Sequence, residues 1–131
     1  MSSIALDTNI AVAILNGKTA IIELLQQFGD IYLPVTVSGE LLFGAKNSAN
    51  RLRNESRHRA FIDSCILLDT NSLVADAYAE IRLFLKQKGR PIPENDIWIA
   101  ALCVVHDIRL LSYDKHFEYV DGLLLQRPPE A

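Results

Sequence analysis

Four acidic residues stand beside apolar segments that are spread along the chain: Asp7, Glu40, Asp96 and Asp114. Carboxylates held about 6 Å apart repel each other by roughly 3 kcal/mol per pair at an effective dielectric near 20. Four of them in one place would therefore take up protons or cations. Mg²⁺ or Mn²⁺ is the natural occupant, because hard ions prefer oxygen ligands and also bind a substrate phosphate. One ion could activate water while a second stabilises the leaving oxygen, as in two-metal displacement at phosphorus.

Each acid taken alone also has a purely structural explanation. An Asp after a strand is usually a helix cap, and an Asp before an apolar helix, such as Asp96, suits the positive end of that helix. The chemical interpretation therefore depends on the elements that position the four side chains.

Short apolar runs predict the strands of the fold. Four of them read as buried strands: Ile4–Leu6, Ile31–Val35, Cys65–Leu68 and Arg109–Ser112. Leu123–Leu125 is a candidate edge strand. The segments between the strands predict helices. A helical hairpin, capped by Thr8 or Asn9, runs to Phe28, and a further helix is capped by Thr36 or Ser38. The other predicted helices are Asn50–Ser64, Ser72–Lys88 and Ile97–Val105, and Asn95 or Asp96 begins the last of them.

Strands that alternate with helices predict an α/β fold, a three-layer α/β/α sandwich around a central, mainly parallel sheet. Ligands of such sheets bind outside the carboxyl ends of the strands. Asp7 and Asp114 both come just after a predicted strand, and Asp96 begins the helix that leads into the strand before Asp114. We therefore expect three of the four acids to converge on one edge of the sheet.

The composition predicts one soluble domain spanning residues 1–131, because half of the residues are apolar. No apolar run approaches the roughly 20 residues of a membrane-spanning helix, and the start lacks the pattern of a signal peptide, so we expect a cytoplasmic protein. Cys65 and Cys103 are predicted to be buried, reduced thiols, and Trp98 is predicted to lie in the core. The net charge of −3 gives no global sign of nucleic-acid binding.

Four sequence stretches carry a resemblance to a known family. Asp7 lies in IALDTN, Glu40 in SGELLFGA, Asp96 in PENDIWIAA and Asp114 in LLSYDKHF. In this order they resemble the signature of the PIN-domain ribonucleases over nearly the whole chain. The pattern is most similar to that of the VapC-like toxins of type II toxin-antitoxin systems, with Asp-Thr-Asn near the start, Glu before a Gly-containing helical turn, and Asp-x-x-Ile-Ala-Ala.

The resemblance implies a metal-dependent endoribonuclease that is one half of a toxin-antitoxin pair. Asp7, Glu40, Asp96 and Asp114 would hold Mg²⁺ or Mn²⁺, and Thr8, Asn9 and Ser112 would orient their carboxylates. The family implies structured RNA such as tRNA as substrate, a homodimer, and a cognate antitoxin protein. The antitoxin tail would lie in an apolar groove on the first two helices, lined by Ile14, Leu15, Ile21, Leu24 and Leu25.

Other polar residues are weaker candidates. The basic run RLRNESRHR either holds the RNA backbone or is a solvated helix face, and its candidate contacts are Arg51, Arg53, Arg57 and Arg59. His58, His106 and His116 lack the spacing of metal ligands, so we expect them at the surface or at helix ends. Glu94 either adds to the metal site or faces solvent, and we favour solvent.

Two other functions compete with the nuclease. A haloacid-dehalogenase-like phosphotransferase also has an Asp after its first strand, but its chemistry needs a second Asp two positions later, where this chain has Asn9. A catalytically silent α/β binding domain would use the acids as helix caps, since fold does not dictate function. Such a domain would bind no divalent metal tightly and would cleave nothing.

Overall fold

The computed structural model describes residues 2–129. Its sheet has five strands: β1 (Ser3–Leu6), β2 (Asp30–Pro34), β3 (Ile66–Leu68), β4 (Arg109–Leu111) and β5 (Leu125–Gln126). The helices of the described residues are α1 (Thr8–Leu15), α2 (Thr19–Leu25), α3 (Val35–Lys46), α4 (Arg51–Ser64), α5 (Ser72–Gln87), α6 (Glu94–His106) and the 3₁₀ helix η1 (Lys115–Tyr119).

The strands pair in the order β3-β2-β1-β4-β5, and every pair is parallel. β1 is central, with Ala5 opposite Tyr32 of β2 on one side and Leu110 of β4 on the other. Because β1 is covered on both faces, Ile4, Ala5 and Leu6 are completely buried. The all-apolar strand and the parallel pairing are the features that the sequence predicted.

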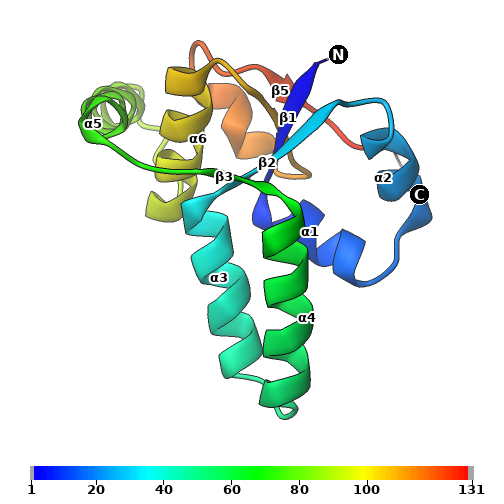
Figure 1. Ribbon diagram of the computed structural model, residues 1–131. Coiled ribbons are helices and arrows are strands. Elements are labelled where there is room, and N and C mark those ends of the chain that lie inside the picture. The colour runs from blue at the N-terminus through cyan, green and yellow to red at the C-terminus, as the bar shows by residue number, and fades with distance from the viewer. Residues whose placement is uncertain (1, 130–131) are drawn as a thin grey trace.

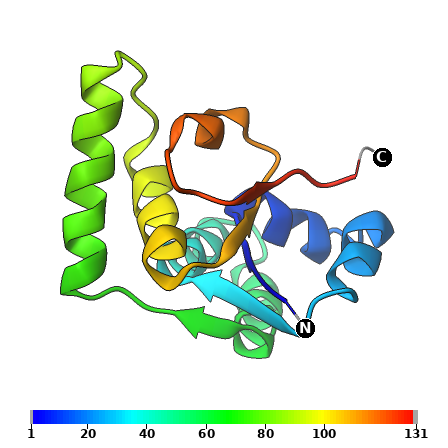
Figure 2. The ribbon, with the colours of Figure 1, turned by 90° about the horizontal axis from the view of Figure 1, so that it is seen from above.

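Helices cover both faces of the sheet. Figures 1 and 2 show α5 and α6 on one side and α1 and α2 on the other, which confirms the three-layer α/β/α sandwich. α6 is the innermost helix, with Ile99 to Cys103 all at most 1% exposed. The helices α3 and α4 pack side by side and extend away from the sheet (Figure 1). The carboxyl ends of the central strands therefore meet the first turns of α1, α3 and α6.

Three helices begin earlier than the sequence predicted: α1, which starts at Thr8, and the two that follow a proline, α3 and α6. α3 starts at Val35 and has no side-chain cap, so neither Thr36 nor Ser38 caps it. Pro34 is the N-cap residue, with an extended backbone (φ −57°, ψ 139°) and no side-chain acceptor, so the helix begins uncapped directly after β2.

Pro93, with a φ of −53°, has the same effect on α6, which begins at Glu94 instead of Asn95 or Asp96. Asp96 is consequently a first-turn residue of α6 and not its cap, although it still lies at the positive end of this helix, as predicted.

Three predictions of buried residues were only partly right. The strand β3 lies at the edge of the sheet, so only Leu68 is buried, whereas Ile66 and Leu67 are 44% and 54% exposed. Trp98 is half-buried, because its ring lies at the edge of α6 and stacks on Tyr78 of α5 with the ring centres 3.9 Å apart. Cys103 is buried, whereas Cys65 is half-buried at the end of α4; both thiols are free.

Among the described residues no single helix is long and apolar enough to cross a membrane, although α1 and α2, bent by 114° at their junction, meet that composition test together.

Candidate active site

Asp7 stands at the carboxyl end of β1 and is itself the cap of α1, in place of Thr8 or Asn9. Its backbone is extended, and its Oδ1 accepts a hydrogen bond from the Thr8 N–H at 2.8 Å. Its Oδ2 accepts one from the Ser112 hydroxyl at 2.6 Å. Asp7 is only 2% exposed, so both carboxylate oxygens are held by defined donors in a nearly dry place. Asp7 therefore both caps α1 and forms part of the acidic site.

The strand β4, next to β1, brings Asp114 to the same edge of the sheet. The Ser112 hydroxyl, which donates to Asp7, also accepts from the Asp114 N–H at 2.9 Å. The Asn9 side-chain amide donates to Asp114 Oδ2 at 3.3 Å, and its oxygen accepts from the Tyr113 N–H at 3.4 Å. These bonds fix the segment after β4 against the first turn of α1.

Glu40 reaches the site from the other side of β1. It lies in the second turn of α3, which directly follows β2, the other neighbour of β1. The Thr8 hydroxyl donates to Glu40 Oε2 at 2.8 Å, so the residue after Asp7 links this carboxylate to the end of β1.

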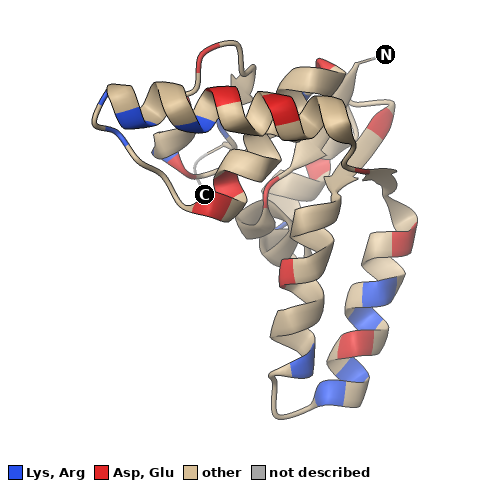
Figure 3. Cartoon of the chain, turned by 90° about the vertical axis from the view of Figure 1, so that its left-hand side faces the viewer, with Lys and Arg blue, Asp and Glu red and all other residues tan. Residues whose placement is uncertain are grey.

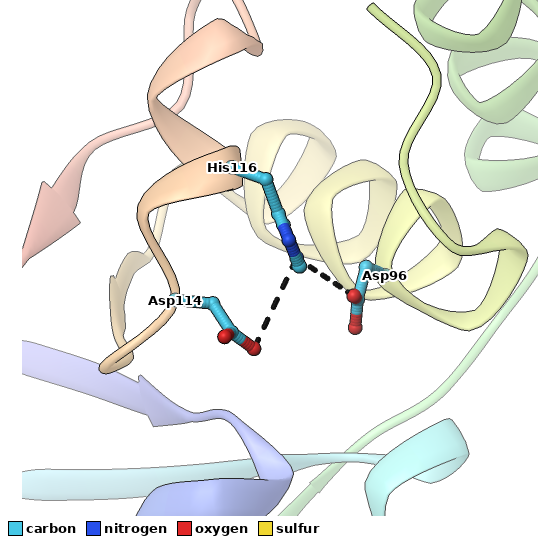
Figure 4. Close-up of side chains that lie close together, drawn as sticks. All are labelled: Asp96, Asp114 and His116. Carbon is cyan, nitrogen blue, oxygen red and sulfur yellow. Dashed lines mark ion pairs between the residues drawn. The ribbon is translucent and has the colours of Figure 1, made fainter.

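Asp96 and His116 complete the cluster. Asp96 lies in the first turn of α6, and its Oδ2 is 2.8 Å from His116 Nε2. The same nitrogen lies 3.9 Å from Asp114 Oδ2. Figure 4 shows the three side chains pointing toward one another from α6, from the segment after β4 and from η1. The donor atoms of these three residues all lie within 4.8 Å of one another.

All four predicted acids line one open hollow of about 530 Å³. Its other lining residues are Thr8, Asn9, Val12, Pro93 and Asn95. Within the described part of the chain, this lining includes neither Lys nor Arg. The predicted edge of the sheet is therefore a concave acidic surface that is open to solvent on one side.

The local pKa values show how crowded the acids are. Burial, together with the charges of Asp96 and Asp114, raises the pKa of Asp7 to about 6, although the hydrogen bonds from Ser112 and Thr8 oppose the shift. Burial also raises the pKa of Asp96; contact with His116 opposes this shift and the charges of Asp114 and Glu40 add to it.

The residues present fit a divalent cation. Carboxylate oxygens are the ligands that hard ions prefer. Because burial and the neighbouring acids raise the pKa values of Asp7 and Asp96, a bound cation would stabilise their ionised forms. In addition, the His116 Nε2 is buried and lies 2.8 Å from Asp96 Oδ2, without a well-aligned hydrogen bond among the described residues. An ion between these donors would satisfy both features.

The sequence missed His116, which we expected at the surface or at a helix end. Its ring lies beside Asp96 of α6 and Asp114 of the segment after β4. The histidines were judged by the usual spacings of metal ligands, which do not include the Asp-x-His spacing of residues 114 and 116. His106 is exposed at the end of α6, as predicted, whereas His58 is half-buried in the middle of α4, where its Nδ1 pairs with the Leu41 carbonyl at 2.8 Å. Glu94 also faces solvent, with 67% of its side chain exposed.

The four arginines proposed for RNA binding lie on α4, and Figure 3 shows basic residues along this helix. Arg51 and Arg59 both pair with Glu55, at 2.7 and 3.7 Å, and Arg57 donates to the Leu15 carbonyl. Arg53 forms no ion pair within residues 2–129. Ion pairing on the surface of α4 therefore competes with any phosphate for at least two of the four guanidinium groups.

A family model described as the PIN domain matches residues 4–123. The chain is 30% identical over 123 residues to ribonuclease VapC2 of Haemophilus influenzae, which covers 90% of this chain and 92% of that protein. It is 27% identical over 128 residues to the tRNA(fMet)-specific endonuclease VapC of Shigella flexneri, which covers 94% of this chain and 96% of that protein.

The fold is similar to that of VapBC2 from Rickettsia felis, whose crystal structure contains a DNA fragment from the promoter. The TM-score is 0.89 at 27% identity, with 97% of this chain and 99% of the other covered. The sequence match and the fold agree, and the chain belongs to the PIN-domain family, in its VapC-like group.

Proposed function

We propose that this protein, as one domain, is a metal-dependent endoribonuclease and the toxin of a VapBC-type pair. The observation that carries the proposal is the connected set of four acids at one hollow. They come from four separate parts of the chain, and Thr8, Asn9 and Ser112 each hydrogen-bond to at least one of them. Four carboxylates that served only as helix caps would have no need to meet. Asp96 and Glu40 do not cap a helix at all.

Asp7, Glu40, Asp96 and Asp114 are the proposed ligands of Mg²⁺ or Mn²⁺. A bound ion supplies an activated water and neutralises charge on the phosphate in the displacement. The chain itself positions the ligands: Ser112 and the Thr8 N–H fix the Asp7 carboxylate, and the Thr8 hydroxyl fixes Glu40. Such contacts keep the ligand oxygens in place when a substrate phosphate enters the open side of the hollow.

The proposed substrate is RNA, with tRNA as the first class to test, because a curated relative is named a tRNA(fMet)-specific endonuclease. Single-stranded or loop segments should be preferred, since unstacked nucleotides reach a recessed site more easily than a duplex does. Arginines of α4, and of these above all the unpaired Arg53, would contact the RNA backbone. Arg82 and Lys86 of α5 line a second hollow beside Glu94, at the start of α6, and add cations close to the acidic site.

The proposed protein partners are a cognate antitoxin and a second copy of the chain, acting in the cytoplasm. The antitoxin groove predicted on the first two helices needs one correction. Ile21 is 1% exposed and belongs to the core, so it cannot line a groove. Val12 and Ile22, at 42% and 39% exposed, are instead the large apolar residues that these two helices offer to a partner.

The competing phosphotransferase finds no support in the site. The position that would hold its second Asp is Asn9, whose amide donates to Asp114 Oδ2 and therefore orients a carboxylate. An acid at position 9 would repel Asp114 from the same place.

The test is to incubate the purified protein with total tRNA in Mg²⁺, in Mn²⁺ and in EDTA. We expect defined fragments with either ion and none in EDTA. An attacking water also leaves no 2′,3′-cyclic phosphate, which distinguishes this cleavage from that of metal-free contaminating ribonucleases. Asp96→Asn should abolish cleavage, while the exposed Asp69→Asn should not change it. Cleavage that persists in EDTA, or in the Asp96→Asn protein, would refute the proposal.

A further inference from the structure

The position of the His116 ring raises the question of its role in the acidic cluster. Its Nε2 is buried, lies 2.8 Å from Asp96 Oδ2 and 3.9 Å from Asp114 Oδ2, and has no aligned hydrogen-bond acceptor within residues 2–129. A ring nitrogen this close to two carboxylate oxygens, without a well-aligned hydrogen bond, can share an ion with them. The ring enters from η1, which directly follows Asp114, whereas Asp96 comes from α6.

The two distances from His116 Nε2 to the carboxylate oxygens are compatible with ligands of one octahedral ion. Ligand atoms about 2.1 Å from an ion lie about 3.0 Å apart when adjacent and about 4.2 Å apart when opposite. The two contacts of His116 Nε2, 2.8 and 3.9 Å, are near these values, and the donor atoms of Asp96, Asp114 and His116 are all within 4.8 Å of one another. Little rearrangement is therefore needed to hold one ion among them (Figure 4).

We propose that His116 Nε2 is a nitrogen ligand of the divalent ion held by Asp96 and Asp114, and that it makes the site prefer Mn²⁺ to Mg²⁺. The inference rests on the proposed metal dependence and specifies which ion the site selects. Mg²⁺ favours oxygen ligands and water, whereas first-row transition ions accept imidazole readily. A site with carboxylates alone would have a weaker preference for Mn²⁺.

The alternative is that His116 only positions the Asp96 carboxylate. Both roles would make a His116 variant bind metal less tightly, so affinity for one ion does not separate them. The ratio of Mn²⁺ to Mg²⁺ affinity does, because a positioning residue affects both ions alike. Direct detection of nitrogen on the bound ion separates them as well.

The experiment measures Mn²⁺ and Mg²⁺ binding by calorimetry for the wild type, His116→Gln, His116→Asp and the control His106→Gln. We expect the affinity ratio to fall about tenfold or more in His116→Gln. His116→Asp, which offers an oxygen ligand instead, should keep Mg²⁺ binding while the ratio stays low. His106→Gln changes an exposed histidine at the far end of α6 and should leave the ratio unchanged.

Electron spin-echo spectroscopy of the Mn²⁺-loaded protein provides the second measurement. Nitrogen modulation should appear in the wild type and in His106→Gln, change on labelling histidine with ¹⁵N, and vanish in both His116 variants. If the wild type binds Mn²⁺ without nitrogen modulation, or if the ratio is the same in all four proteins, this inference is wrong while metal dependence stands. If the wild type binds neither ion, the proposed function fails with it.

Discussion

Replacing Asp7 by Asn should stabilise the metal-free protein at pH 8, although it removes a proposed ligand. Burial and the charges of Asp96 and Asp114 raise the pKa of Asp7 from 3.8 to about 6. A shift of roughly 2 units means that the ionised side chain costs the folded state about 3 kcal/mol. An Asn side chain of the same shape does not ionise, but it has one acceptor oxygen where Asp7 has two. One of the hydrogen bonds from Thr8 and Ser112 is therefore lost or reversed, at a cost of about 1 kcal/mol. The net gain is about 2 kcal/mol.

The gain should depend on pH with a defined sign. Because the folded-state pKa of Asp7 is raised, the folded protein binds more protons than the unfolded chain between about pH 4 and pH 6. The contribution of this group to stability is therefore fully present below about pH 4 and is lost as the pH rises through 6. The advantage of Asp7→Asn should be complete at pH 8 and absent near pH 4.

Thermal melts in EDTA at pH 8 and pH 4 measure this difference, and 2 kcal/mol corresponds to about 6 to 10 °C for a chain of this size. The matched control is Asp69→Asn. Asp69 also accepts an N–H, from Thr70 at 2.8 Å, but it is exposed and outside the cluster, so its replacement should change stability by less than about 0.5 kcal/mol. In excess Mg²⁺ the wild type should gain more than Asp7→Asn. If Asp7→Asn melts at or below the wild-type temperature in EDTA at pH 8, the reasoning about crowded charge is wrong.

Three further predictions concern RNA, growth and ligand positioning. Replacing the four arginines of α4 by Ala should lower RNA affinity and leave metal binding unchanged. The slope of log affinity against log salt should fall by about 0.7 per lost phosphate contact. If the RNA affinity is unaltered, this helix is a solvated face and not an RNA-binding surface. Expression of the protein alone should slow growth, and co-expression of the immediately upstream gene should restore it; a harmless protein that copurifies with nothing would contradict the toxin assignment. Thr8→Val should lower metal affinity about tenfold, because Glu40 loses its donor, while Thr70→Val should not.

The parts of the site that the sequence predicted follow from the local rule that parallel strands share one carboxyl edge. Asp7 and Asp114 come directly after strands, so their approach depends only on β1 and β4 being neighbours. Thr8 and Ser112 are adjacent in sequence to these acids or strands, and their contacts follow from the same placement. Little tertiary detail was needed for this part.

His116 could not be predicted in the same way. Its partner Asp96 is twenty residues earlier, and the contact depends on the turn of η1 that rotates the ring toward α6. The α4 arginines illustrate a related limit. Their clustering suggested a phosphate-binding face, but Glu55 lies one helical turn from both Arg51 and Arg59 and pairs with each. A count of basic residues does not include such pairing.

The tetrapeptide Leu-Asp-Thr-Asn occurs twice in the chain, at residues 6–9 and 68–71, and both copies follow a strand. The second copy follows β3, at the edge of the sheet, where its Asp is exposed and its Asn caps α5 by accepting the Val74 N–H at 3.0 Å.

The first copy follows the central strand β1, which has a neighbour on each side. One neighbour, β4, supplies the Ser112 hydroxyl to its Asp, and the helix after the other neighbour supplies Glu40 to its Thr. The same four residues therefore build an ordinary helix start at an edge and an acidic cluster at the centre. The strand order decides which copy of the motif becomes part of an acidic site. Only a central strand has neighbours on both sides that can bury its Asp carboxylate and bring other charges to it.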